Sequence, residues 1–421
     1  MKILFLTQII PYPPDAGPRV KTLHVLRHLI RRGHEVTLAS FIRPEEEPFL
    51  PAIEELCGEV HAVPIRRSRL ADVGYWLRSH VSGRPFLVER DSLKAMHELV
   101  FRLAKLKQVE VIHADQLTMA QFALSTAERL RPDRQPPRLI FDAHNAVWTI
   151  VERMRAGAPW YLRPVAALEA ARVKRYEGQI AKRFDNTLAV TENDRQALLQ
   201  ALQNASGLPL DASGGNIEVI PIAVDTEGLR PAQRRAGSGN ILTLGTLHYP
   251  PNADGIRWFL QEVFPLVREA VPHASITIIG KNPPSDFKRA AEENPETIRV
   301  TGYVPDLDPY MEAAEIMVVP VRAGGGMRVR ILEAFARGMP LVTTTVGLEG
   351  IQALDGEAVL VADSPEAFAR ATVRLLQQPV LQAKLAANGR QLAESHYDWQ
   401  VVLGKMDELY KPKQVRFPDP S

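Results

Sequence analysis

The sequence contains one cysteine, Cys57, in 421 residues. A single cysteine excludes a disulfide within the chain and a zinc site built from clustered cysteines, and it fits a reducing compartment. No run of about 18 apolar residues is present, so we predict no membrane-spanning helix. Thr7 and Gln8 interrupt the apolar N-terminus and no small-residue cleavage site follows, which argues against a signal peptide. The predicted location is the cytoplasm.

Strong compositional bias is also absent. Charged residues make up 24% of the chain and apolar residues 45%, and the net charge is +2. These values are typical of an ordinary folded protein rather than a disordered or nucleic-acid-binding one, so we expect no nucleic-acid partner. The sequence has no internal repeat, and its length predicts two domains.

A strand, a glycine-rich loop and a helix are predicted between Val318 and Ala336. Three successive glycines follow the apolar strand, and apolar residues then recur at the spacing of a helix with one buried face. Gly338 and Pro340 are expected to end that helix. Glycines let a ligand approach the backbone, and a helix N-terminus attracts anions.

Two arginines, Arg328 and Arg330, lie in the first turn of this helix. A positive charge there opposes the helix dipole, so a purely structural role explains both residues poorly. We predict that they bind phosphate. The alternative, a flexible glycine turn with two solvated arginines, stays open.

The N-terminal segment predicts a βαβ unit. A buried strand at 2–7, a helix at 20–30 and a second strand from Glu35 indicate a parallel sheet with a right-handed crossover. Ligands bind beyond the carboxyl ends of such strands, where Gly17 falls. Its neighbour Arg19 is either a phosphate ligand or a helix-start residue.

Two further strands end in polar residues. One runs into His113, Asp115 and Gln116, and the other into His144 and Asn145. A histidine at a strand end is often only a satisfied hydrogen-bonding group, but two such ends together favour a site. The helical spacing of zinc-binding histidines is absent, so no metal site is predicted.

Residues 66–86 form a basic stretch with interleaved aromatic residues. It either lies on an anionic membrane surface, receives a lipid-linked acceptor, or is a solvated face with a few packed aromatic side chains. Farther along, we predict a long helical stretch over 147–183 that wraps the first domain. Thr191 and Asp194 predict a helix cap, and so do Asp306 and Asp308.

A second series of strands and helices begins at Ile241. The predicted fold class is therefore α/β, with two doubly wound, Rossmann-like halves facing a cleft. A polar segment at 228–239 without periodicity is predicted to link them.

The chain resembles retaining glycosyltransferases of family 4, which have the GT-B fold. It is similar in pattern to bacterial exopolysaccharide sugar transferases such as those associated with PEP-CTERM systems. The resemblance covers nearly the whole chain, and five segments carry it: Asp142–Asn145, Leu244–Asn252, Gly302–Asp306, Pro320–Ala334 and Gly347–Gly350.

The resemblance implies a donor held mainly by the C-terminal half, an acceptor held by the N-terminal half, and a last helix that crosses back to the first domain. The expected divisions are an acceptor domain at 1–225, a linker at 226–239, a sugar-nucleotide domain at 240–394, a returning helix at 395–410 and a tail at 411–421.

Individual site residues follow from the same resemblance. Glu333 matches a glutamate that binds the donor ribose, and Arg328 and Arg330 match basic positions that meet the diphosphate. The first glutamate of the family motif would fall at Gly325, so the identity of the sugar stays open. The other expected donor-binding residues are Gly17, Arg19, Gly245, Gly302, Tyr303, Val304, Gly326 and Met327.

Four residues are expected to be catalytic: Asp115, His144, Arg328 and Arg330. His113, Gln116 and Asn145 are candidates for the acceptor side. The predicted reaction is transfer of a sugar, with retention of configuration, from a UDP- or GDP-sugar to a polysaccharide, glycan or lipid-linked acceptor. We expect no cofactor and no metal. The expected location is the cytoplasm, and a peripheral contact with the inner face of the membrane stays open. A nucleotide-sugar epimerase and a non-catalytic donor-binding partner are the alternatives.

Overall fold

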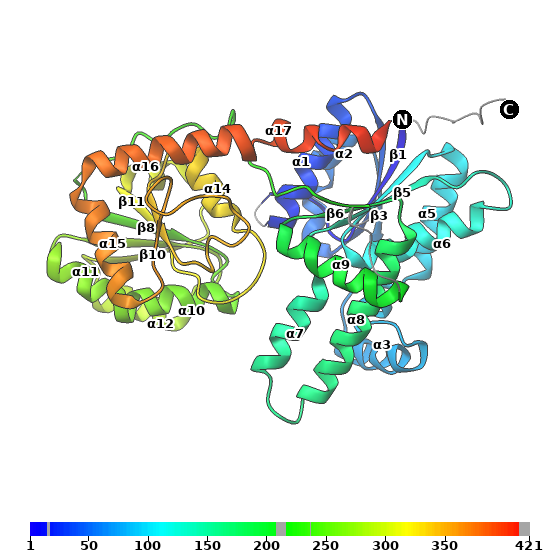
Figure 1. The fold of residues 1–421 in the computed structure, drawn as a ribbon, viewed down its shortest axis with the longest axis horizontal. Coiled ribbons are helices and arrows are strands. Elements are labelled where there is room, and N and C mark those ends of the chain that lie inside the picture. The colour runs from blue at the N-terminus through cyan, green and yellow to red at the C-terminus, as the bar shows by residue number, and fades with distance from the viewer. Residues whose placement is uncertain (15–16, 208–215, 236, 412–421) are drawn as a thin grey trace. The chain divides into compact units, whose positions relative to one another are not determined.

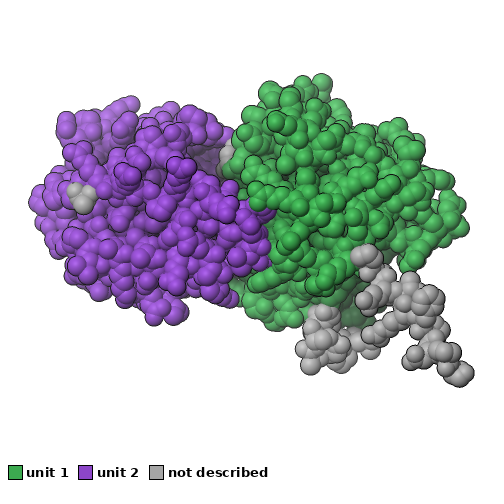
Figure 2. Space-filling view, turned by 90° about the horizontal axis from the view of Figure 1, so that it is seen from above, with its two compact units in different colours: residues 1–221, 403–421 green, residues 222–402 purple. Residues whose placement is uncertain are grey.

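The chain forms two compact units in a computed structural model that describes residues 1–14, 17–207, 216–235 and 237–411. Unit 1 comprises Met1–Pro221 and Leu403–Ser421, and unit 2 comprises Ile222–Val402 (Figure 2). Each unit contains one parallel sheet covered by helices (Figure 1). The prediction of two doubly wound α/β halves is confirmed.

Unit 1 has a seven-stranded parallel sheet in the order β3-β2-β1-β4-β5-β6-β7. The central strand β1 is apolar on both faces because helices cover both sides of the sheet, and residues Ile3 to Leu6 are almost fully buried. The last strand, β7, has only three residues. The strands are β1 Lys2–Thr7, β2 Glu35–Ile42, β3 Glu59–Pro64, β4 Val111–Asp115, β5 Arg138–Ala143, β6 Asn186–Ala189 and β7 Ile217–Val219.

The helices of unit 1 confirm several sequence patterns. Helix α1 begins at Gly17 and ends before Gly33, which has a positive φ of 76°. The Thr191 side chain caps α9 by accepting a hydrogen bond from the Asp194 N–H. The helices are α1 Gly17–Arg31, η1 Pro44–Phe49, α2 Leu50–Cys57, α3 Arg69–Ser82, α4 Phe86–Asp91, α5 Lys94–Lys107, η2 Leu117–Met119, α6 Ala120–Leu130, α7 Val147–Gly157, α8 Arg163–Arg183, α9 Glu192–Ser206 and η5 Asp407–Tyr410.

The helical stretch predicted over 147–183 is divided into two helices. The structure has two helices, α7 and α8, which form a hairpin that projects from unit 1 (Figure 1). Pro159 explains the break, because proline disfavours a helical conformation in the residue before it. Ala158 is accordingly extended, with φ −77° and ψ 150°.

Unit 2 has a six-stranded parallel sheet in the order β10-β9-β8-β11-β12-β13. Its strands are β8 Asn240–Leu244, β9 Ser275–Ile279, β10 Ile298–Gly302, β11 Ile316–Val319, β12 Leu341–Thr343 and β13 Leu360–Val361. Its helices are α10 Pro250–Trp258, η3 Phe259–Val263, α11 Phe264–Ala270, α12 Ser285–Glu293, α13 Asp308–Ala313, α14 Val329–Ala336, α15 Pro365–Gln377, α16 Pro379–Leu392 and η4 Ala393–Tyr397.

The last helices carry the chain from unit 2 to unit 1. A backbone bridge joins Val224 to Asp398 within unit 2, and helix α17, Trp399–Gly404, then contains the change of unit at Leu403. The tail predicted at 411–421 lies outside the described residues except for Lys411.

Each sheet has a topological switch point next to its first strand. In unit 1, β1 lies between β2 and β4, and in unit 2, β8 lies between β9 and β11. In open α/β sheets, ligands bind outside the carboxyl ends of the strands at such a point. The predicted site residues belong to these two edges.

Candidate active site

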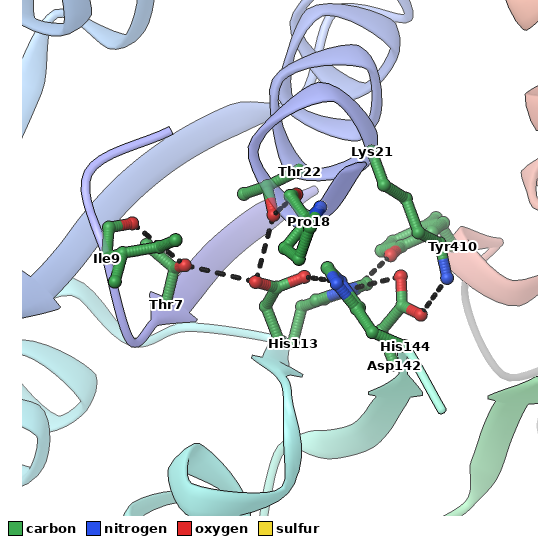
Figure 3. Close-up of polar contacts among 10 residues, drawn as sticks. Thr7, Ile9, Pro18, Lys21, Thr22, His113, Asp142, His144 and Tyr410 are labelled. Atoms are coloured by element: carbon green, nitrogen blue, oxygen red, sulfur yellow. Dashed lines mark hydrogen bonds and ion pairs between the residues drawn. The ribbon is translucent and has the colours of Figure 1, made fainter. Parts of the chain in front are cut away.

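A buried hydrogen-bond network occupies the switch point of unit 1. Asp115, the last residue of β4, is fully buried and accepts hydrogen bonds at Oδ2 from the hydroxyls of Thr7 and Thr22, each at 3.0 Å. His144 donates from Nε2 to Asp115 Oδ1 at 2.7 Å (Figure 3). The structure therefore brings the predicted residues Asp115 and His144 together, and three donors engage the Asp115 carboxylate.

Asp142 forms the second half of this network. It is fully buried and accepts a hydrogen bond from the ammonium group of Lys21, which is also buried (Figure 3). Burial opposes ionisation of Asp142, but the Lys21 charge outweighs it and holds the pKa of Asp142 below its usual range. The pair is therefore an ionised, buried salt bridge.

His113 lies in the core between Phe5 and the C-terminal Tyr410. Its ring stacks on Phe5 with centroids 4.3 Å apart, and its Nδ1 is 2.6 Å from the Tyr410 hydroxyl. Burial raises the pKa of Tyr410 well above its usual value, so the hydroxyl stays protonated. It therefore donates a hydrogen bond to Nδ1 of His113. The Nε2 then carries the hydrogen and faces Asp142 Oδ2 at 3.7 Å. His113 therefore contacts the network, not a surface open to an acceptor.

The two other acceptor-side candidates lie beside this network. Gln116 has φ 74°, a left-handed conformation that is uncommon outside glycine, and its N–H donates to the Asp142 carbonyl oxygen at 3.0 Å. Such strain often marks functional sites. Asn145 is partly buried and follows His144 directly.

Glu177 fixes the chain just after Asn145. Its carboxylate accepts hydrogen bonds from the Val147 and Trp148 N–H groups at 2.7 and 3.0 Å, at the start of α7. Burial raises the pKa of Glu177 to about 8. The base of the α7–α8 hairpin is thus anchored beside the strand ends.

One group of side chains in the described part of the chain has the composition of a metal site: His113, Asp115 and Asp142. The Lys21 ammonium already neutralises Asp142, and hydroxyl and imidazole donors take both oxygens of Asp115. A divalent ion would have to displace these partners, so the arrangement fits a hydrogen-bonded network better than a metal centre.

Gly17 and Arg19 lie at the start of α1. Gly17 is its first residue, and Arg19 donates to Glu46 Oε1 at 2.7 Å. The sequence left Arg19 as either a phosphate ligand or a helix-start residue. In the structure its guanidinium has a carboxylate partner within the chain, Glu46.

The glycine loop lies at the switch point of unit 2, between β11 and α14. Gly324 and Gly326 have positive φ values of 106° and 83°, which explains why glycine is needed there. The predicted helix is confirmed as α14, with Arg328 at its N-cap. The Arg328 guanidinium donates to the carbonyl oxygens of Gly325 and Gly326, so it braces the loop. Met327, the residue before it, is buried.

Arg330 connects α14 to the end of β8. Its guanidinium donates to the Leu244 carbonyl oxygen at 3.1 Å and to Asn252 Oδ1 at 2.8 Å, while its buried Nε–H has no hydrogen-bond partner among the residues that the structure describes. Burial and the neighbouring Arg328 lower its pKa to about 10, so it stays charged at neutral pH. A charged group with an unsatisfied buried N–H is ready to receive an anion.

Close approach explains Gly245. A Cβ there would lie 2.4 Å from Arg330 Nη1, and a Cβ at Gly280 would lie 1.9 Å from the Gly245 carbonyl oxygen. Both glycines let the loops at this edge of the sheet pack around the arginine. Glu333, one turn farther along α14, is partly buried, and burial raises its pKa.

The remaining predicted donor residues follow β10. Gly302 ends the strand with φ 75°, and Tyr303 is exposed with the Lys281 ammonium 4.5 Å from its ring centroid. Val304 is partly buried. Asp306 accepts a hydrogen bond from the Asp308 N–H, but the N-cap of α13 is Leu307, which makes no side-chain cap, and the Asp308 carboxylate pairs with Arg337. The two aspartates therefore do not form the predicted cap.

Sequence reasoning missed several members of the site. Lys21 and Thr22 were treated as part of an ordinary helix, although a lysine on a largely buried helix is a signal in itself. Nothing local to Tyr410 indicates that it contacts His113, because 297 residues separate them.

A cavity of about 470 Å³ between α11 and Asn294 involves none of the predicted residues.

Family models match both units. Residues 17–228 match the model described as glycosyltransferase family 4, and residues 238–378 match glycosyl transferases group 1. The chain belongs to glycosyltransferase family 4. The predicted family is confirmed, and the chain is a glycosyltransferase that uses a nucleotide-sugar donor.

Relatives and solved structures agree with this assignment. An uncharacterised 44.6 kDa protein in the cps region of Klebsiella pneumoniae is 21% identical over 427 residues, covering 96% of this transferase and 98% of the relative. Sucrose-phosphate synthase from Thermosynechococcus elongatus superposes with a TM-score of 0.66 at 17% identity, covering 97% and 98% of the two chains. Anabaena HepE in complex with UDP has a TM-score of 0.65 at 14% identity, covering 97% and 99%. These likenesses identify the GT-B fold.

Proposed function

We propose that the transferase moves a sugar from a UDP- or GDP-sugar to a polysaccharide, glycan or lipid-linked acceptor, with retention of configuration. One observation carries the proposal: at the switch point of unit 2, a glycine loop and a helix N-terminus meet a charged Arg330 whose buried Nε–H lacks a partner in the described part of the chain. This combination suits a diphosphate. Glu333 on the same helix would bind the ribose hydroxyls. The relative from a cps region supports an exopolysaccharide acceptor.

The proposed chemistry depends on stabilising the leaving group. The bond between the anomeric carbon and the diphosphate oxygen breaks while the acceptor oxygen attacks from the same face, and the acceptor proton passes to the departing phosphate. Arg328, Arg330 and the N–H groups of α14 would stabilise the charge that develops. Gly325 offers no carboxylate beside the sugar, and the Asp115 carboxylate is buried under three donors, which makes it a poor general base.

Retention is tested by the configuration of the first product. Proton NMR before mutarotation is expected to show an α-linkage from an α-linked donor, both in the parent protein and in Asp115→Asn, which should turn over more slowly because His144 loses its carboxylate partner. A β-linked first product from the parent would overturn the mechanism.

Metal independence is a second expected result. Asp306 accepts a hydrogen bond from the Asp308 N–H and the Asp308 carboxylate pairs with Arg337, so both carboxylates have partners within the chain. Arg328 and Arg330 supply positive charge near the glycine loop. Initial transfer rates in EDTA should therefore match those in magnesium or manganese. Loss of turnover in EDTA that either metal restores would contradict the proposal.

A donor-only control separates transfer from epimerisation. Incubated with UDP- or GDP-sugars and no acceptor, the protein should at most hydrolyse the donor slowly, and it should leave the sugar's configuration unchanged. Interconversion of the donor sugar would favour an epimerase instead. We also propose that the protein works at the inner face of a membrane, where lipid-linked acceptors are found.

A further inference from the structure

We propose that α3 and the tip of the α7–α8 hairpin form a docking surface for an anionic lipid bilayer. The inference rests on the peripheral location proposed above and assigns it to particular residues. It does not depend on the sugar-transfer chemistry. In the described part of the chain, no helix is long and apolar enough to cross a bilayer, so the contact would be interfacial.

The orientation of α3 is the first observation. Leu70, Val73, Leu77 and Val81 recur on one face of this helix, yet all four are exposed, with Leu70 at 87% and Val81 at 91%. Only Ser79 of the whole helix is buried. A surface helix normally turns its apolar face to the core, so this one presents to solvent the face that would usually be covered.

Charged groups hold α3 and the residues after it on the protein. The guanidinium of Arg78 lies 3.0 Å from Glu89, and that of Arg84 lies 3.3 Å from the same carboxylate, which is buried. These ion pairs hold the helix with its apolar face toward solvent. Transfer of this exposed apolar surface from water into an apolar environment would be favourable.

The hairpin tip is the second observation. Trp160 and Tyr161 lie in the turn between α7 and α8, with Trp160 79% exposed and Tyr161 also exposed, and Leu162, Val165 and Leu168 continue the exposed apolar surface along α8. Tryptophan and tyrosine favour the interface between lipid tails and water. Because Glu177 anchors the base of the hairpin, the tip is presented on a fixed support.

The two elements lie side by side. The Phe86 N–H, just after α3, donates to Glu169 of α8 at 2.6 Å, and Figure 1 shows α3 next to α8 where the hairpin leaves unit 1. The exposed face of α3 and the exposed residues of α8 therefore belong to one region of unit 1.

Charge selects a bilayer over a protein partner. Residues 66–84 contain five arginines and one acidic residue, Asp72, although the whole chain carries a net charge of only +2. Three of these arginines pair with the buried carboxylates of Glu89 and Asp91, which leaves Arg66 and Arg69 as the basic residues for which no such ion pair is recorded. The hairpin is also rich in arginine and contains only two acidic residues before Glu177, namely Glu152 and Glu169. Apolar and aromatic side chains within a basic surface match anionic headgroups over acyl chains.

The test is flotation of the full-length protein with vesicles, without any sugar nucleotide. We expect binding to vesicles of equal parts phosphatidylcholine and phosphatidylglycerol, and much weaker binding to phosphatidylcholine alone. The double variant Trp160→Ser/Tyr161→Ser and the double variant Leu70→Ser/Leu77→Ser should each bind about tenfold more weakly. Arg66→Glu/Arg69→Glu should weaken binding by a similar factor and reduce its salt dependence.

Matched controls remove equally exposed apolar groups elsewhere. Leu106→Ser on α5 and Val380→Ser on α16 replace residues that are 77% and 85% exposed, and both should bind vesicles like the parent. Arg131→Glu serves as the control for charge. Equal vesicle binding by surface and control variants would overturn the proposal. So would sedimentation of the parent as a dimer that Trp160→Ser/Tyr161→Ser dissociates, because a second copy would then cover this face.

The sugar-transfer proposal is judged separately, with a soluble acceptor. Variants that lose vesicle binding but keep transfer to a soluble acceptor support the docking surface. Normal vesicle binding with no transfer to any acceptor would leave the surface intact and reject the proposed reaction.

Discussion

Replacing Lys21 with methionine is expected to lower the free energy of unfolding by about 3 to 5 kcal/mol, the range for removing one partner of a buried ion pair. Lys21 and Asp142 are both buried, and the lysine charge keeps Asp142 ionised. Without the ammonium group, the carboxylate must remain charged in the core or take up a proton. Urea unfolding followed by circular dichroism measures the change.

Two controls make this prediction specific. Lys105→Met breaks an ion pair with Asp133 on the same unit at 3.0 Å, but both side chains are more than half exposed, so the cost should be at most about 1 kcal/mol. The double variant Lys21→Met/Asp142→Asn should regain part of the lost stability, because it also removes the unpaired charge. The interpretation fails if Lys21→Met costs no more than Lys105→Met.

The sequence was informative wherever the signal was local. The glycine run before α14, the cap at Thr191 and the polar ends of β4 and β5 each depend on a few neighbouring residues, and the structure confirms these elements. The break at Pro159 was also a local signal, but the helical periodicity on both sides was given too much weight.

Contacts between distant segments were not predictable. Tyr410 reaches His113, and Asp407 lies 2.7 Å from His28, because the chain returns to unit 1 at its end. The sequence left the environment of residues 66–86 open, and the apolar spacing of α3 alone is the pattern of a helix that packs on a core. The direction a helix faces depends on what its neighbours offer, here Glu89.

Arg328 and Arg330, the two arginines at the start of α14, have internal hydrogen bonds that the sequence did not predict. Sequence reasoning treated both as phosphate ligands, whereas in the structure each also stabilises the protein itself. Arg328 braces Gly325 and Gly326, and Arg330 ties α14 to Leu244 and Asn252. The two roles are compatible, because an arginine held in place by internal hydrogen bonds loses less freedom when it binds an anion.

Arg330→Ala and Arg328→Ala are each expected to weaken binding of the free nucleoside diphosphate by about 1.5 to 3 kcal/mol, the range for hydrogen bonds to charged groups. Arg330→Ala should have the larger effect, because it also releases Leu244 and Asn252 at the edge of the site. Isothermal titration with UDP and GDP measures the affinity, and thermal unfolding checks that each variant is folded.

Arg322→Ala is the matched control for both variants. Arg322 belongs to the same segment between β11 and α14, but it is exposed and pairs with Asp254 at 3.2 Å, so its removal should leave diphosphate affinity unchanged. Glu333→Gln provides the complementary result. Loss of a contact to the ribose should weaken the binding of nucleosides and of nucleotides by the same factor. If both arginine variants bind UDP and GDP as tightly as Arg322→Ala, the glycine loop is not the diphosphate site. If all three arginine variants lose affinity equally, the effect comes from net charge rather than from the positions of Arg328 and Arg330.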